Sequence, residues 1–186
     1  YYSTQLKIGD PNAKIIGTSM LNWDYTCIGC AGIYICSDQV LFGYQCGRKW
    51  FEEFINSYES AYGSKPDVDA WGLDVYPLDW INTPNSVVHA PIATSQIQGM
   101  REFLSQIPEY EDTPIWITEI GLHIGYDSWK FEGAGMKPVG AYNWDKMSDY
   151  LESTLSWLTD NSEPLNISRW FFYTTYKDII NPAPDG

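Results

Sequence analysis

Four short apolar segments alternate along the chain with amphipathic segments, and this alternation restricts the possible folds more than any other feature. The apolar segments are rich in β-branched and aromatic residues, as strands are, and cover residues 13–18, 68–77, 113–123 and 169–174. Between them, apolar residues recur at helical spacing over 50–62, 94–107 and 143–158. Strands that alternate strictly with helices form a parallel sheet covered by helices. The sequence therefore predicts an α/β fold.

Signals at the ends of these segments agree with the alternation. Gly63 and Pro108 follow the first two helical segments, while Thr94 and Asn143 are suitable N-caps. A glycine-rich connection over 125–140 precedes the last helix.

We expect residues 1–186 to form a single partial domain. A chain of this length can bury about 70% of the surface that it exposes when unfolded, which is enough for one core. It opens on Tyr1-Tyr2-Ser3-Thr4-Gln5-Leu6-Lys7-Ile8, which has the pattern of the end of a helix. We therefore expect the N-terminal part of a longer protein to be absent.

The composition argues against several classes of partner. The formal net charge is −13, and both nucleic acid and anionic membranes repel an acidic surface. No run of about 18 apolar residues is present, so no transmembrane helix is expected. No strand is followed by a glycine-rich phosphate-binding motif, which leaves nucleotide binding without support. The nine Trp are compatible with core packing and with stacking on sugar rings.

The cysteines lie together in a loop that we expect to cover residues 24–47: Cys27, Cys30, Cys36 and Cys46. A loop of this length on a compact domain is usually functional or held in place. Two disulfides would hold it in an extracellular protein, and a zinc ion bound by four thiolates would hold it in an intracellular one. The spacing lacks the second close pair that is typical of zinc sites, so we favour disulfides, with zinc as the alternative.

A carboxylate, Glu119, lies near the end of the third strand. A charge at the end of a buried strand costs free energy unless it is paired, hydrogen-bonded or used in catalysis. Glu119 is therefore a candidate catalytic residue; the alternative is that its side chain simply turns into solvent where the strand ends. In parallel α/β folds the residues that follow the strands share one edge. Besides Glu119, this edge would hold Asn22, Trp23, Asp24, Asp74, Tyr76, Asp79, Trp80, His123, Tyr173 and Tyr176.

Carboxylate, amide, phenol and indole groups at one edge indicate a sugar site, because indoles stack on sugar rings and the polar groups bind hydroxyls. A metal site would need two or three histidines, and the chain has only His89 and His123, far apart in the sequence. We expect no metal or other cofactor at this edge.

The segment Trp116–Gly121 resembles the strand-seven motif that carries the nucleophile in retaining glycoside hydrolases with a TIM (β/α)8 barrel. Segments 10–17, 69–77 and 170–173 resemble strands five, six and eight of the same family. The resemblance covers nearly the whole chain but only the second half of the family's barrel. It implies a TIM barrel to which this chain contributes about the last four βα units, strands 5 to 8.

The resemblance implies that Glu119 is the nucleophile, which forms a covalent glycosyl intermediate. The family's acid/base is a Glu in an Asn-Glu pair at the end of strand four, and it should lie about 5 Å from the nucleophile. No Asn-Glu pair occurs in this chain, so we expect the acid/base upstream of Tyr1. We expect substrate contacts from Trp23, Asp24, Asp74, Tyr76, Trp80, His123 and Tyr173.

We therefore expect a glycoside hydrolase that cleaves a β-linked polysaccharide or oligosaccharide with retention of configuration, outside the cell or at its surface. The alternative is a non-catalytic glycan-binding or structural half-barrel, which pairs with a missing N-terminal half or with another copy because open sheet edges associate. An Asn-Glu pair upstream of Tyr1 would favour the enzyme.

Overall fold

The computed structural model describes residues 2–21, 23, 25–27, 33–35, 46–76, 90–121, 129–132, 135–138 and 144–173. The helices in it are α1 (Tyr2–Gly9), α2 (Gly47–Tyr62), α3 (Ala90–Leu104) and α4 (Trp144–Asn161). The strands of the main sheet are β1 (Ile16–Leu21), β4 (Ala70–Val75), β5 (Ile115–Ile120) and β8 (Ile167–Phe172). Two antiparallel hairpins pair β2 (Tyr25–Cys27) with β3 (Ile33–Ile35) and β6 (Trp129–Glu132) with β7 (Gly135–Pro138).

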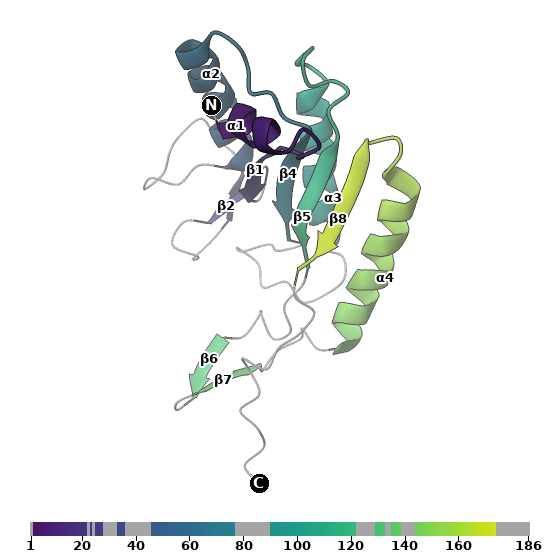
Figure 1. Cartoon of the computed structure of the whole chain (residues 1–186). Helices are drawn as coiled ribbons and strands as arrows, with labels where there is room; N and C mark the ends of the chain where they lie inside the picture. Colours follow the sequence, from purple (N-terminus) through teal and green to yellow (C-terminus); the bar gives the residue numbers. More distant parts are fainter. Residues whose placement is uncertain are drawn as a thin grey trace.

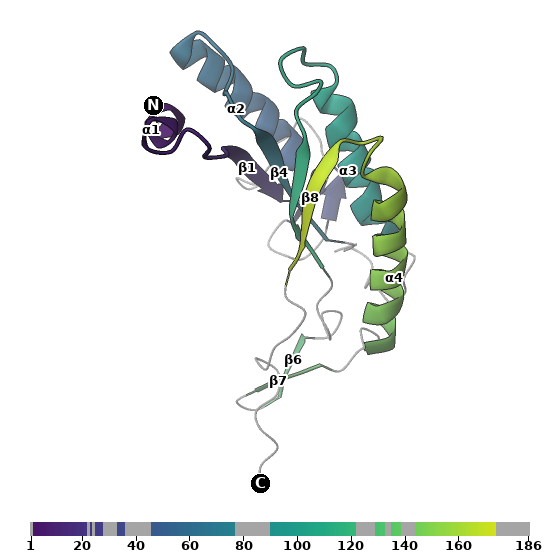
Figure 2. The same ribbon diagram turned by 45° about the vertical axis from the view of Figure 1, so that its right-hand side comes forward.

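The main sheet has the strand order β1-β4-β5-β8, and every neighbouring pair is parallel. This confirms the predicted α/β fold with a parallel sheet. The strands follow one another across the sheet in chain order, so each crossover moves in the same direction. Because such crossovers are right-handed, α2, α3 and α4 lie on one face of the sheet, as Figures 1 and 2 show. Among the described residues, every helix is too short or too polar to cross a lipid bilayer.

The core lies between this face of the sheet and the three helices. The sheet contributes Trp71, Leu73, Val75, Ile115, Ile117, Ile120 and Ile167. The helices contribute Phe51, Ile55, Ala93, Ile97, Met100, Leu104 and Leu158. In β4 the buried core side chains alternate with Gly72 and Asp74, which therefore belong to the opposite face. We call this opposite side the open face of the sheet.

A β-bulge interrupts β5 directly before Glu119. Leu73 of β4 pairs with Ile117 of β5, and the next residue of β4, Asp74, pairs with Glu119. Thr118, which lies between Ile117 and Glu119, is therefore an extra residue in β5. In a regular strand, residues three positions apart face opposite sides, yet Ile117 and Ile120 are both buried in the core. The bulge therefore reverses the alternation and brings Glu119 to the open face, on which Asp74 also lies.

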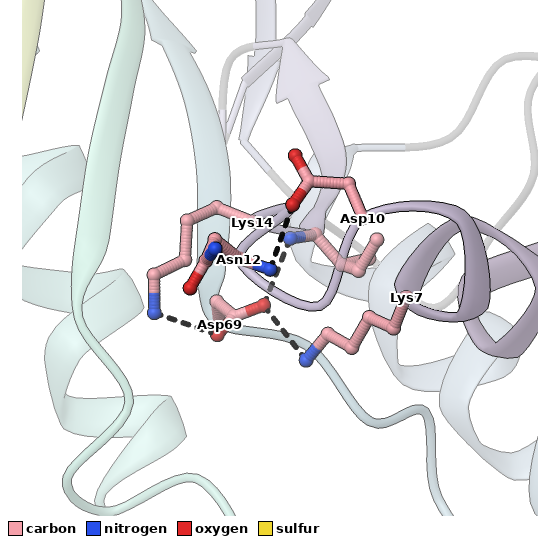
Figure 3. Close-up of polar contacts among 6 residues, drawn as sticks. Lys7, Asp10, Asn12, Lys14 and Asp69 are labelled. Atoms are coloured by element: carbon pink, nitrogen blue, oxygen red, sulfur yellow. Dashed lines mark hydrogen bonds and ion pairs between the residues drawn. The ribbon is translucent and has the colours of Figure 1, made fainter.

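At the other end of the sheet, a cluster of charges holds the starts of β1 and β4 together (Figure 3). Asp69, directly before β4, accepts a hydrogen bond of 2.9 Å from the backbone N–H of Ile15. The Nζ atoms of Lys7 in α1 and of Lys14 each lie 3.1 Å from an Asp69 carboxylate oxygen. The backbone hydrogen bond, followed by the two lysines, lowers the pKa of Asp69 from its ordinary value of 3.8 to about 2.

Element boundaries differ from the predicted ones in several places. β1 begins at Ile16 and β8 at Ile167, rather than at 13 and 169. α3 begins at Ala90, about one turn before the expected cap at Thr94; Pro91 is tolerated in the first turn because its missing N–H needs no partner there. The hairpin β2–β3 lies in the expected cysteine-rich loop 24–47, and β6–β7 lies in the expected glycine-rich connection 125–140.

Candidate functional site

Four of the predicted site residues lie at the carboxyl end of the sheet: Asp74, Tyr76, Glu119 and Tyr173. Asp74 and Glu119 are neighbours in the β4–β5 ladder. Tyr76 directly follows β4, and Tyr173 directly follows β8. They come together because three parallel strands end at the same edge of the sheet.

Tyr76 connects two of these residues. Its hydroxyl donates a hydrogen bond to Oε2 of Glu119, and its ring packs edge-on against the Tyr173 ring, with centroids 6.3 Å apart and an interplanar angle of 88°. Burial raises the pKa of the Tyr76 phenol, and the hydrogen bond to Glu119 raises it further. The phenol therefore keeps its proton at neutral pH and stays a hydrogen-bond donor to the carboxylate.

A second set of hydrogen bonds crosses the open face beside Glu119. Thr118 Oγ1 lies 2.6 Å from Asp74 Oδ1 and 2.7 Å from Ser19 Oγ. A threonine hydroxyl has a single proton. With Asp74 ionised, Thr118 donates to Asp74 and accepts from Ser19, so the chain of hydrogen bonds runs from β1 through β5 to β4.

Asp74 lies in an environment that favours its protonated form. Burial raises the pKa of its carboxyl group, the hydrogen bond from Thr118 opposes this shift, and the nearby charge of Glu119 adds to it. Asp74 therefore keeps its proton to a higher pH than a surface aspartate does. Active sites commonly hold carboxyl groups whose pKa is shifted in this way by burial and by a neighbouring charge.

The ends of β5 and β8 approach each other closely at Gly121. The Tyr173 backbone N–H donates to the Ile120 carbonyl at 2.9 Å. A Cβ atom on Gly121 would lie 2.6 Å from the Tyr173 carbonyl oxygen, closer than real Cβ atoms come. The glycine thus allows the approach that places Tyr173 beside Tyr76.

Trp23 lies away from this site, in contrast to the prediction that it contacts substrate. Its side chain is 0% exposed and packs edge-on against Phe51 and Phe103, with ring centroids 5.7 and 5.5 Å away. In this position the indole contributes to the core between the sheet and helices α2 and α3. The other predicted contacts, Asp24, Trp80 and His123, lie outside the described residues.

Of the four cysteines, only Cys46 has a described side chain. It directly precedes α2, is 3% exposed, and its sulfur belongs to a disulfide. Cys27 is described in its backbone alone, as the last residue of β2, and Cys30 and Cys36 lie outside the described residues. The pairing within the cluster therefore stays a prediction. Within the part of the chain that the structure describes, no three His, Cys, Asp or Glu side chains form a group that could hold a metal ion.

Sequence reasoning missed Ser19 and Thr118 as members of the site. Their hydroxyls come from strands that are separated by β4, and the two residues are 99 positions apart. Thr118 adjoins Glu119, which is the one signal that could have drawn attention to it. Nothing in the sequence near Ser19 indicates its contact.

The fold and the site define a parallel α/β protein with two carboxyl groups, two phenols and two alcohols toward the carboxyl end of its sheet. No family model and no curated protein matches the chain. A search of solved structures finds a β-glucosidase from Exiguobacterium marinum, with 21% identity, a TM-score of 0.36, and coverage of 59% of this chain and 26% of that one. It also finds the GH1 β-glucosidase from Exiguobacterium antarcticum B7, with 21% identity, a TM-score of 0.38, and coverage of 66% and 28%. The chain thus spans little more than a quarter of either enzyme, and similarity of this degree does not place it in their family.

Proposed function

We propose that the chain is part of a retaining glycoside hydrolase with a (β/α)8 barrel, in which Glu119 is the nucleophile. The observation that carries the proposal is the position of Glu119. It lies at the carboxyl end of a parallel strand, on the open face of the sheet, where Tyr76 donates a hydrogen bond to it and Asp74 lies beside it. The carboxyl ends of barrel strands are where such folds place their chemistry.

The arrangement of strands and helices supports four consecutive units of a barrel wall, strands 5 to 8. A doubly wound sheet carries helices on both faces, whereas a barrel keeps its helices on the outer face. Here α2, α3 and α4 share one face. The outermost strands carry exposed apolar side chains, Leu21 in β1 and Phe171 in β8, which are 57% and 47% exposed. Further strands of the barrel, supplied upstream of Tyr1, would cover them.

The proposed reaction proceeds in two steps. A Glu119 carboxylate oxygen bonds to the anomeric carbon while the glycosidic C–O bond breaks, and the acid/base carboxyl, expected upstream of Tyr1, protonates the leaving oxygen. Water then attacks the glycosyl ester, loses its proton to the same acid/base group, and releases Glu119. Tyr76 holds the carboxylate in place during both steps. The substrate is a β-linked polysaccharide or oligosaccharide, contacted by Asp74 and Tyr173 and, outside the described residues, by Asp24, Trp80 and His123.

The proposed reaction needs two carboxyl groups and water, and we propose no cofactor for it. The disulfide at Cys46 supports a location in an oxidising environment, outside the cell or at its surface.

The test is turnover of a panel of aryl β-glycosides by the full-length protein and its Glu119→Gln variant. Glu119→Gln should lower kcat by about three orders of magnitude or more, because the amide cannot form the ester. Glu152→Gln, on an exposed position of α4, is the matched control and should retain activity. A slow fluoroglycoside substrate should leave its sugar on Glu119, seen by mass spectrometry of the peptide. Full activity of Glu119→Gln would refute the proposal.

A second candidate is a glycan-binding half-barrel without catalysis. Absence of an Asn-Glu pair upstream of Tyr1 would favour it, because a retaining enzyme needs its second carboxyl group. In that case calorimetry would detect binding of an oligosaccharide, the glycosides would stay intact, and Glu119→Gln would change the affinity alone.

A further inference from the structure

The contact between Ser19 and Thr118 is unusual because β4 lies between their strands. Gly72 of β4 is the residue that pairs with Ser19 in the ladder, and it belongs to the open face. A Cβ atom on Gly72 would overlap the Ser19 Oγ atom. The missing side chain therefore leaves the space through which the Ser19 hydroxyl reaches Thr118.

Thr118 is also the residue that makes the bulge in β5. If Thr118 instead occupied a regular strand position, without the bulge, the alternation from Ile117 onward would turn Glu119 toward the helices and the apolar core. A bulge of one residue can change its backbone conformation unless neighbouring groups hold it, since its ladder hydrogen bonds are disrupted. Here the Thr118 hydroxyl is held from two sides, by Asp74 at 2.6 Å and by Ser19 at 2.7 Å.

We propose that Asp74 is a positioning residue, which acts through the Thr118 hydroxyl to hold the β5 bulge and thereby the orientation of Glu119 toward Tyr76. Ser19 holds the same hydroxyl from the other side, and Gly72 makes its approach possible. The inference rests on the proposed function insofar as Glu119 is the reacting group. Its structural part, the control of the Glu119 side chain by Asp74 and Thr118, is measurable without any turnover.

This role requires an acceptor oxygen at position 74 rather than a charge. Asp74→Asn keeps a carbonyl oxygen that accepts from Thr118, whereas Asp74→Ala removes the acceptor. In the same way, Thr118→Ser keeps the hydroxyl, and Thr118→Val removes it while conserving the branched shape. The two pairs of variants separate positioning from electrostatic and packing effects.

The first measurement is the NMR shift of the Glu119 side-chain carboxyl carbon in full-length protein labelled with ¹³C-glutamate, with Glu119→Gln to assign the signal. Asp74→Ala and Thr118→Val should move this signal to the position of solvent-exposed glutamates. Asp74→Asn, Thr118→Ser and the control Thr18→Val, an exposed threonine of β1, should leave it within error of the wild-type shift. If Thr118→Val fails to fold, Ser19→Ala supplies the same test without changing β5, and should move the signal part of the way.

The inference is wrong if Asp74→Ala and Thr118→Val leave the Glu119 signal unchanged, or if Asp74→Asn moves it as far as Asp74→Ala does. The second measurement is the kinetics of the same variants. Asp74→Ala and Thr118→Val should both lower kcat roughly tenfold to a hundredfold, as expected for a misplaced catalytic group. Thr118→Val, at a residue without a proposed substrate contact, should do so with little change in KM. Should Glu119→Gln be fully active, the proposed function fails, while the NMR result still decides whether Asp74 positions Glu119.

Discussion

The Tyr76 hydroxyl donates a hydrogen bond to the Glu119 carboxylate across the β4–β5 pair, although the two residues are 43 positions apart in the sequence. Both side chains are half-buried. A carboxylate in such a place needs donors to replace lost water, and the phenol supplies one that stays protonated because burial and the carboxylate raise its pKa. The pair is therefore a structural unit as well as the centre of the candidate site.

Tyr76→Phe should remove this donor and leave the shape of the ring unchanged. We expect the free energy of unfolding to fall by about 1–3 kcal/mol, because a partly buried carboxylate loses its partner. Urea denaturation measures the change, and kcat on the best aryl glycoside should fall in parallel. Tyr62→Phe is the control: that ring is 67% exposed, and its substitution should change stability by less than about 0.5 kcal/mol. Equal stability of the two variants would contradict the assigned role of Tyr76.

Gly121→Ala should disturb the site without touching a polar side chain. The added methyl group would meet the Tyr173 carbonyl oxygen at 2.6 Å, and a backbone atom cannot move aside cheaply. We expect a loss of about 1–3 kcal/mol in the free energy of unfolding, typical of overpacking, and displacement of Tyr173 from Tyr76. Gly9→Ala provides the comparison, because nothing lies within 4 Å of its added Cβ. Unfolding curves that shift equally in both variants would argue against the close approach of β5 and β8.

The parallel sheet could be predicted from the sequence because burial itself produces the apolar pattern. Ile115 and Ile117 are both 0% exposed, and the amphipathic segments pack on the same core. The bulge at Thr118 could not be predicted, because it depends on which residues of β4 pair with those of β5. The sequence of β5 alone does not contain this information. The same limit applies to Trp23, because the pattern at a strand end does not tell whether an indole turns to the core or to the open edge.

The hydrogen bond between Ser19 and Thr118 depends on residues that lie still farther apart in the sequence. It requires that β4 lies between β1 and β5 and that the residue facing Ser19 is Gly72. Neither condition is visible before the order and register of the strands are known. The strand-end positions of Glu119 and Tyr76 could be predicted from the alternation of apolar and amphipathic segments, whereas the turn of Glu119 to the open face depends on the bulge.

Asp69→Asn should remove a contribution to stability that depends on pH. The pKa of Asp69 is lowered in the folded protein to about 2 from 3.8, so the folded state binds protons more weakly than the unfolded state. The contribution is therefore fully present above about pH 5 and is lost as the pH falls from about 4 through 2. The difference in unfolding free energy between wild type and Asp69→Asn, measured by urea denaturation, should shrink over that range. Asp67→Asn, at an exposed position two residues earlier, is the control for the removal of a neighbouring carboxylate.

Asp74→Asn should show a pH dependence of the opposite sign. Burial raises the pKa of Asp74, so the folded state binds a proton more tightly than the unfolded state, and the wild-type protein loses stability as the pH rises from the ordinary aspartate value of 3.8 through the raised value. The uncharged amide that Asp74→Asn introduces avoids this loss and still accepts from Thr118.

We therefore expect Asp74→Asn to be more stable than wild type at pH 7, with an advantage that disappears as the pH falls toward 4. Urea denaturation at several pH values measures this, with Asp69→Asn as the internal comparison of opposite slope. A wild-type protein that stays more stable than Asp74→Asn across the whole range would mean that the charge of Asp74 strengthens the fold. In that case the bond from Thr118 outweighs the cost of burial, and Asp74 would remain ionised beside Glu119.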